Sequence, residues 1–391
     1  MGAQRRGHPD PPDQARPLPD RGRAERVSRM AETGCRRMSP YQRLRNTPAF
    51  ADLCRVSARL GRDALQVQGP GGNAPLKNDA AMLVKASGTW LAEAETEDIM
   101  VPVDLARLRK ALKSGDPKAD NGIAFVPEGE NPGGLRPSIE SSVHAIFDWP
   151  VVLHTHCVAT IATALRADAG QVVAERLADL GAVFVPYTKP GLALAQAIDA
   201  VTDPETRVLV LGNHGLAAGA ETAEEAERLI REVAGRLTPA LCGQEPATPD
   251  LPQSLGDHGW RAVDHGPTTA LAFDPGLLRR LRGGSFYPDH VIFLGPGVFV
   301  ADPEEPAEAA LARAAAEPRQ NLVVFPGRGV ALPADASPAM QAMARCLGDV
   351  AQRLDPDAAL TRLTAEDEAE LLNWDAEKYR QTLDRSPVPG A

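Results

Sequence analysis

The sequence lacks three features that would each point to a particular class of protein. Its five cysteines, Cys35, Cys54, Cys157, Cys242 and Cys346, stand far apart and form no C-x-x-C pair. This disfavours a disulfide framework or a cysteine-built zinc site and fits a reducing cytoplasm. No apolar run reaches the ~18–20 residues of a membrane helix. The formal net charge of −10 argues against a protein held on nucleic acid by phosphate contacts. We therefore expect a cytoplasmic protein that binds neither membrane nor nucleic acid.

The chain has 391 residues and is 43% hydrophobic, enough for two domains of ordinary size. Residues 1–38 are crowded with Arg, Pro, Asp and Gly and show no apolar period, which predicts a disordered tail. A first domain is expected over 39–238 and a smaller second α/β domain over 253–383. The proline-rich stretch 239–252 is the predicted linker, and 384–391 is a second polar tail.

In the first domain, apolar runs of strand type alternate with helical periods, which predicts a layered α/β/α fold. Expected helices cover 41–60, 97–112, 139–147, 158–165, 171–180, 193–201 and 223–237. Expected strands cover 151–153, 183–186 and 207–211, with two short strand-like runs around the glycine turn inside 66–85.

The second domain shows the same alternation. Expected strands cover 269–273, 290–294 and 322–325, and expected helices cover 277–281, 306–316 and 338–354. Two short segments of it resemble segments of the first domain: 323–330 resembles 209–216, and 291–294 resembles 151–154. Arg328 and Leu294 then replace histidines. The second domain could be a degenerate repeat without metal chemistry, although chance similarity explains two short matches equally well.

Three histidines follow the expected strands in suggestive places. His154 and His156 are two residues apart, so their imidazoles share one face of an extended strand. His214 follows the strand at 207–211, and strand ends are where ligands gather in α/β sheets. Three neutral imidazoles are a common ligand set of catalytic Zn²⁺. The alternative is that His214 is a turn histidine beside glycine.

Glu140 stands at the start of the helix that precedes the His154 strand. Its carboxylate could bind the ion or act as acid/base, or it could simply favour the first turn of the helix. His144 lies one turn later and is expected to pack or to support the site rather than bind metal. The remaining candidates, His258, His265 and His290, are scattered and expected to be structural.

Two small-residue loops suggest anion binding. The stretch 69–77 offers backbone N–H groups and Asn73, and Ala86-Ser87-Gly88-Thr89 follows the next strand. Ser138 lies just before Glu140. Neither loop has a Walker or Rossmann fingerprint, so phosphate recognition and plain turns are both open.

Five short motifs, in their order along the chain, resemble the class II aldolase/adducin family. They are Gly71-Gly72-Asn73, Ala86-Ser87-Gly88-Thr89, Ser138-Ile139-Glu140, His154-Thr155-His156 and Asn213-His214-Gly215. The likeness covers about residues 45–237. The stretches 136–140, 185–191 and 363–379 resemble most the aldolase part of bifunctional rhamnulose-1-phosphate aldolase/short-chain dehydrogenases. No G-x-G-x-x-G unit of the dehydrogenase half follows.

The resemblance implies a homo-oligomer with a divalent metal, zinc in the first place. It implies His154, His156 and His214 as metal ligands, Glu140 as the acid/base, and Asn73, Ser87, Gly88 and Ser138 as phosphate contacts. Two features depart from the smaller fuculose-phosphate aldolases. Ile139 replaces a second serine, and their mechanistic tyrosine has no counterpart in 157–168, so the second proton carrier is open.

The implied activity is cleavage of a ketose 1-phosphate, or a related sugar derivative, to dihydroxyacetone phosphate and an aldehyde. A metal-stabilised enediolate carries the charge that this cleavage creates. The same ligands would serve an epimerase, a decarboxylase or a dehydratase of a sugar phosphate or sugar acid. A non-enzymatic, adducin-like interaction protein is the third possibility, and retention of the histidines and Glu140 speaks against it.

Overall fold

The computed structural model describes residues 2, 38–239, 241, 248–317 and 319–385. The chain divides into two units, Met1–Ser39 and Pro40–Ala391. Apart from residues 2 and 38, the predicted N-terminal tail lies outside the described residues. So do part of the predicted linker and residues 386–391. Everything below concerns the second unit.

A seven-stranded sheet forms the centre of the first half of this unit. Its strands are β1 (Leu76–Lys77), β2 (Ala81–Lys85), β3 (Met100–Asp104), β4 (Val151–Thr155), β5 (Ala182–Val185), β6 (Val208–Leu211) and β7 (Gly215–Ala220). They lie in the order β3-β2-β1-β4-β7-β6-β5. Strands β5 and β6 are parallel, and the other neighbours are antiparallel.

Side chains on the two faces of this sheet belong to two different cores, because successive residues of a strand point in opposite directions. Val151 and Leu153 join one core, and Val152 joins the other. The first core contains residues of α2 (Pro40–Arg45), α3 (Pro48–Gly61), α6 (Val158–Ala164), α7 (Ala169–Arg176) and α9 (Ala223–Leu237). The second contains residues of α4 (Leu105–Ser114), α5 (Ser141–Ile146) and α8 (Leu192–Asp199). The predicted α/β/α layering is thus confirmed.

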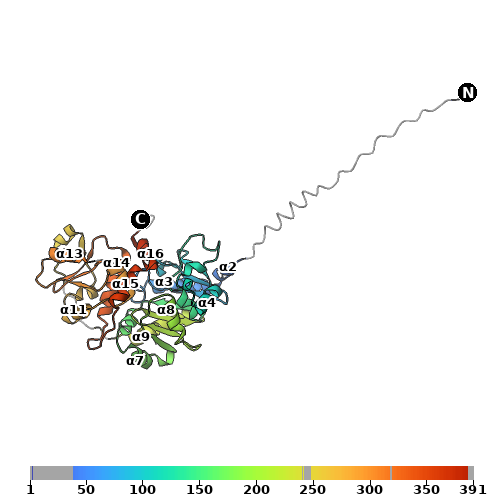
Figure 1. Cartoon of the computed structure of the whole chain (residues 1–391), viewed down its shortest axis with the longest axis horizontal. Coiled ribbons are helices and arrows are strands. Elements are labelled where there is room, and N and C mark those ends of the chain that lie inside the picture. Colours follow the sequence, from blue (N-terminus) through green and yellow to red (C-terminus); the bar gives the residue numbers. More distant parts are fainter. Residues whose placement is uncertain (1, 3–37, 240, 242–247, 318, 386–391) are drawn as a thin grey trace. The chain divides into compact units, whose positions relative to one another are not determined.

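A smaller, four-stranded sheet follows. Its strands are β8 (Trp260–Ala262), β9 (Phe299–Val300), β10 (Val323–Phe325) and β11 (Gly329–Pro333), in the order β8-β11-β10-β9. The helices of this half are α10 (Gly266–Ala270), α11 (Pro275–Leu281), α12 (Pro288–Leu294), α13 (Ala307–Ala316), α14 (Pro338–Ala351), α15 (Ala365–Asn373) and α16 (Asp375–Arg385). Helices α15 and α16, red in Figure 1, end the described chain and contact α12.

The two halves share a core. Val158 and Ile161 of α6 belong to the same apolar cluster as Met343 and Leu347 of α14. A polar link reinforces the contact, since Asn213 Nδ2 donates to the carbonyl oxygens of Phe286 (2.9 Å) and Thr361 (3.1 Å). No helix among the described residues is long and apolar enough to cross a membrane.

Two helix predictions in the first half need correction. The helix expected over 97–112 begins only at Leu105, because Met100–Asp104 pairs with β2 as strand β3. Asp104 caps α4 by accepting from the Arg107 N–H at 3.0 Å, which sets its start. The helix expected over 41–60 is two helices, since Thr47 caps α3 ahead of Pro48.

Strand predictions around the glycine turn and in the second half also need correction. Residues 66–68 form no strand, so the glycine turn is preceded by a loop. The segments 269–273 and 290–294 were expected as strands but are helical or turn, and α12 includes all of 290–294. Apolar runs of this length do not distinguish buried strands from buried helices, and Pro288 favours a helix start. Strand β7 was not predicted, because its residues are mostly alanine and glycine.

Candidate metal centre

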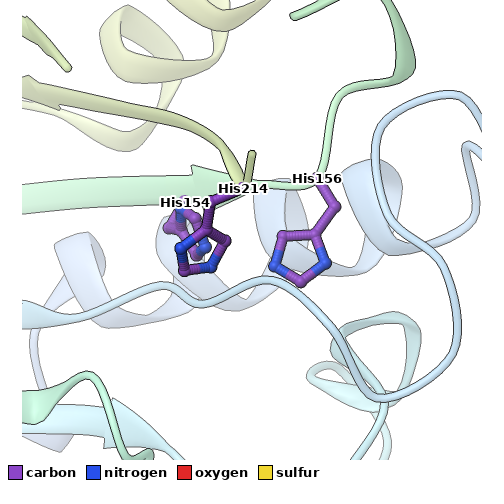
Figure 2. A group of neighbouring side chains, drawn as sticks. All are labelled: His154, His156 and His214. Carbon is purple, nitrogen blue, oxygen red and sulfur yellow. The ribbon is translucent and has the colours of Figure 1, made fainter. Parts of the chain in front are cut away.

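The three predicted histidines come together at one end of the large sheet. His154 lies on β4, opposite Ala217 of β7, and His156 follows the end of β4. His214 lies in the turn between β6 and β7, where Asn213 adopts φ 53°. Because β7 is the neighbour of β4, the turn brings His214 beside His154, and the ring centres are 5.0 Å apart. His156 lies 5.1 Å from His154 and 5.3 Å from His214 (Figure 2).

Their nitrogen atoms meet the requirement for one shared ion. One ligand atom from each histidine lies within 4.8 Å of the others, and no other such group occurs among the described residues. His154 Nδ1 lies 3.0 Å from the Leu216 carbonyl oxygen, which fixes its ring. Its Nε2 is buried and has no hydrogen-bond partner in the part of the chain described. A buried nitrogen without a hydrogen bond, in a cluster with two further imidazoles, fits a metal ligand.

His156 is oriented by a residue from the second half of the chain. Its Nδ1 lies 3.2 Å from Asp289 Oδ2. Figure 2 shows one ring nitrogen of His156 facing His154 and His214 and the other facing away. The Asp289 carboxylate therefore lies beside Nδ1 and leaves Nε2 for the ion. This arrangement of carboxylate, histidine and metal fixes tautomer and ring direction in many metal sites.

Glu140 lies where the sequence placed it. It precedes the first turn of α5, and Ser138 Oγ accepts from its backbone N–H at 3.1 Å. Glu140 Oε1 is 3.4 Å from His154 Nε2 and 3.3 Å from His214 Nε2. One carboxylate oxygen thus touches two of the three candidate ligands.

Burial sets the charge state of this group. Desolvation lowers the pKa of His214 to about 3, although the Glu140 carboxylate acts in the opposite direction. It lowers the pKa of His154 as well, so both imidazoles are neutral near pH 7, as metal ligands must be. Burial alone would raise the pKa of Glu140, but the positive charge that the adjacent imidazoles carry when protonated outweighs it and lowers that pKa to about 2. The site therefore offers neutral nitrogens and one carboxylate.

Three of the four predicted phosphate contacts line the same small cavity as Glu140, His156 and His214. They are Ser87, Gly88 and Ser138. Ser87 N–H donates to the Arg136 carbonyl and Ser138 N–H to the Lys85 carbonyl, which holds the two loops together. Asn73 does not line this cavity. Its Oδ1 accepts from the Ala74 N–H, and its backbone pairs with that of His154.

Four buried charged residues of the site escaped the sequence analysis. Lys85 donates to the carbonyl oxygens of Pro70 (3.1 Å) and Thr89 (2.7 Å) and so ties the two small-residue loops together. Arg380 Nη1 lies 3.0 Å from both Asp289 Oδ1 and Glu377 Oε2. All four line the cavity. They belong to no sequence motif. Asp289 of α12 and Glu377 and Arg380 of α16 reach the cavity only through tertiary packing.

The other histidines that the structure describes, His144, His258, His265 and His290, are not part of the cluster. His144 is buried 6.4 Å from the His154 ring, and neither ring nitrogen has a partner among the described residues. His290 is buried, with Nε2 at 2.8 Å from the Gly297 carbonyl oxygen. His265 contacts Thr268, and His258 is exposed. The structural role expected for these last three fits their positions.

A comparison with protein families matches residues 51–236 to the Class II Aldolase and Adducin N-terminal domain. The matched segment contains all three histidines and Glu140. A curated relative, the "Uncharacterized oxidoreductase YuxG" of Bacillus subtilis (strain 168), is 28% identical over 188 residues, which are 44% of this chain. The chain spans only 27% of the length of that relative.

Solved structures similar to this one include two whose titles name an aldolase. The N-terminal class II aldolase domain of a conserved protein from Thermoplasma acidophilum is 23% identical, with a TM-score of 0.42. The match covers 49% of this chain and 92% of that one. The L-fuculose-1-phosphate aldolase of Thermus thermophilus is 19% identical, with a TM-score of 0.34, covering 48% and 90%.

The order of motifs, the layered sheet and the family match agree with one another. Through residues 51–236, a little under half of its length, the chain is similar to the class II aldolase/adducin family.

Proposed function

We propose that this protein is a metal-dependent aldolase that cleaves a ketose 1-phosphate into dihydroxyacetone phosphate and an aldehyde. The observation that supports this most is the contact of Glu140 Oε1 with two candidate ligand nitrogens, at 3.3 and 3.4 Å. A carboxylate so close to the ligands lies beside any carbonyl bound there, where it can give or take a proton. An interaction protein would have no use for this arrangement.

The histidines would hold a divalent cation, zinc in the first place, through His154 Nε2, His156 Nε2 and His214 Nε2. Bound there, such a cation supplies Lewis-acid stabilisation of the negative charge that carbon–carbon cleavage creates. Glu140 carries the proton to or from the carbon next to the carbonyl. The hydroxyls of Ser87 and Ser138 and the loop N–H groups bind the phosphate and fix the position of the reacting carbons.

The buried residues from α12 and α16 keep water from this pocket and hold the ligands in place. Arg380 neutralises the Asp289 carboxylate, and this carboxylate keeps the His156 ring turned toward the other two histidines.

We also propose that the protein works in the cytoplasm as a homo-oligomer and that residues 253–383 form a domain of their own.

The test uses the full chain loaded with zinc and supplied with L-fuculose 1-phosphate and L-rhamnulose 1-phosphate. We expect dihydroxyacetone phosphate and an aldehyde as products, identified by mass spectrometry. Glu140→Gln should keep the bound zinc and lose cleavage by about 100-fold or more. An isomer, loss of CO₂ or loss of water would instead indicate the epimerase, decarboxylase or dehydratase. Full activity of metal-free protein would falsify the metal assignment.

A further inference from the structure

The metal pocket is too small for an organic ligand. Its volume is about 40 Å³, which is room for about three water molecules, whereas small-molecule sites usually measure about 300–1,000 Å³. A second cavity of about 540 Å³ lies beside it. Helix α16 lies between the two spaces, since its Glu377 and Arg380 line the metal pocket and its Tyr379 lines the larger cavity. A ligand can therefore reach the three histidines only after a wall of the pocket moves.

Helix α16 is the wall with the weakest apolar anchorage. It contributes no side chain to any of the apolar clusters that the described residues form. Its two buried side chains among those described, Glu377 and Arg380, are both charged, and Leu383 is 38% exposed. By contrast, Val291 and Phe293 of α12, another wall, belong to an apolar cluster. An element with few buried apolar contacts opens at a low cost in free energy.

The contacts that hold α16 in place are mainly polar. Arg380 pairs with Asp289 of α12 and with Glu377 of its own helix, both at 3.0 Å. Since Glu377 moves with the helix, opening breaks only the pair with Asp289. A buried ion pair adds little net stability, because both groups give up hydration to form it. A further contact is one hydrogen bond, from Gln381 Nε2 to the Ile292 carbonyl oxygen at 3.0 Å.

The connection to the rest of the chain can act as a hinge. Helix α15 ends at Asn373 and α16 begins at Asp375, so Trp374 alone separates them, with φ −74° and ψ 127°. Helix α15 is anchored, because Leu371 lies in an apolar cluster. A hinge needs only a few residues at the end of an element to absorb a change in backbone angles.

We propose that α16 is a gate, which swings away from its position here to admit any ligand larger than a few water molecules and then closes over it. With α16 displaced, the metal pocket joins the larger cavity in one space. The gate controls access whatever reaction follows, so it goes beyond the proposed function. All of α16 lies outside the matched segment 51–236.

The first experiment locks the gate with Ser337→Cys/Asp384→Cys in the full chain. The Ser337 hydroxyl donates to the Asp384 carboxylate, so cysteines there are placed for a disulfide that holds α16 closed. The oxidised, zinc-loaded variant should transfer its zinc to 4-(2-pyridylazo)resorcinol at least about 10-fold more slowly than the reduced one. Tris(2-carboxyethyl)phosphine should restore the rate. The two single variants control for oxidation elsewhere and should not respond.

The second experiment needs neither disulfide nor metal. Hydrogen exchange of the metal-free full chain, followed by mass spectrometry, should be at least about 10-fold faster in α16 than in α14. Gln381→Ala should speed exchange in α16 a further ~2- to 10-fold, the loss of one hydrogen bond. Lys378→Ala is the matched control, because Lys378 is exposed and pairs with Asp375 of the same helix.

Either of two results would overturn the gate: equal zinc transfer with the disulfide closed and open, or exchange in α16 as slow as in α14. If the unaltered protein held no zinc, the proposed metal chemistry would fail, and hydrogen exchange would still decide the gate.

Discussion

The two sheets of this chain have the same plan, and among the described residues only the large sheet carries a candidate metal centre. Four neighbouring strands of the large sheet lie in the order β4-β7-β6-β5, and the small sheet has the order β8-β11-β10-β9. The pairing directions agree as well. In the large sheet β4 is antiparallel to β7, β7 is antiparallel to β6, and β6 is parallel to β5. In the small sheet β8 is antiparallel to β11, β11 is antiparallel to β10, and β10 is parallel to β9. In each, a helix of 14 or 15 residues follows the fourth strand.

The agreement extends to residue register. In the β6–β7 hairpin Leu211 is opposite Gly215, and in the β10–β11 hairpin Phe325 is opposite Gly329. Both turns contain a residue of positive φ, Asn213 at 53° and Gly327 at 70°. Arg328 therefore occupies the place of His214. The resemblance between segments 209–216 and 323–330 therefore corresponds to equivalent structure.

The second pair of resembling segments, 151–154 and 291–294, has no equivalent structure. Residues 291–294 lie in α12, so Leu294 is not the counterpart of His154 on β4. His154 is opposite Ala217, and the equivalent position in the small sheet, opposite Ala331, is Ala262. Two residues further, Asp264 stands in the place of His156. We keep the degenerate repeat as a hypothesis with these corrected pairs.

The backbone plan alone does not make the site. Alanine offers no ligand atom, and the guanidinium of Arg328 remains protonated, so neither replacement can bind a cation. Before its first strand the small sheet has a 3₁₀ helix, Gln253–His258, whose N-cap is Pro252, whereas the N-cap of α5, before β4, is Glu140. The candidate metal centre of the large sheet depends on three histidines and a carboxylate at a helix start, none of which stands at the equivalent positions of the small sheet.

The sharpest test replaces His214 and Arg328, which occupy equivalent positions in the two hairpin turns, by alanine. His214→Ala removes one of three ligands, so we expect zinc affinity to fall by more than about 100-fold and cleavage by about 1,000-fold or more. Arg328→Ala should leave both unchanged, because the Arg328 guanidinium donates to the Glu305 carbonyl and lies over the Phe325 ring, and neither residue belongs to the candidate metal centre. Zinc content by atomic absorption and a cleavage assay measure the two effects. Equal losses in the two variants would show that the turns act through folding.

A second test concerns the link between the halves. Asp289→Asn keeps the size of the side chain but removes the charge that orients His156 and neutralises Arg380. We expect zinc affinity to fall about 10- to 100-fold. Competition with a fluorescent chelator measures it. Asp302→Asn, at an exposed carboxylate that pairs with Arg313, is the control and should not change zinc affinity. Unchanged affinity in Asp289→Asn would remove the proposed role of the second half in the metal centre.

The sequence predicted the parts of the site that lie close together in the chain or at strand ends. The two-residue spacing of His154 and His156 and the turn position of His214 are local features, so their convergence followed from the sheet pattern. Asp289 and Arg380 could not be found in this way, because their contacts with the site are set by the packing of α12 and α16. Strand β7 was missed for a related reason: an alanine- and glycine-rich strand has weak local preference, and its pairing with β4 is tertiary.

The smallest effect is expected from exchanging the two turn residues of positive φ. Asn213→Gly keeps the backbone conformation and removes both hydrogen bonds, to the Phe286 and Thr361 carbonyls, so the free energy of unfolding should fall by about 1–2 kcal/mol. Gly327→Asn should change it by only about 0.5 kcal/mol, because asparagine tolerates this conformation and a side chain there has open space. Urea denaturation of the metal-free proteins measures both. The Asn213 side chain joins the β6–β7 turn to the second half, and Gly327 has no side chain. Equal destabilisation by the two substitutions would therefore mean that this contact does not distinguish the two turns.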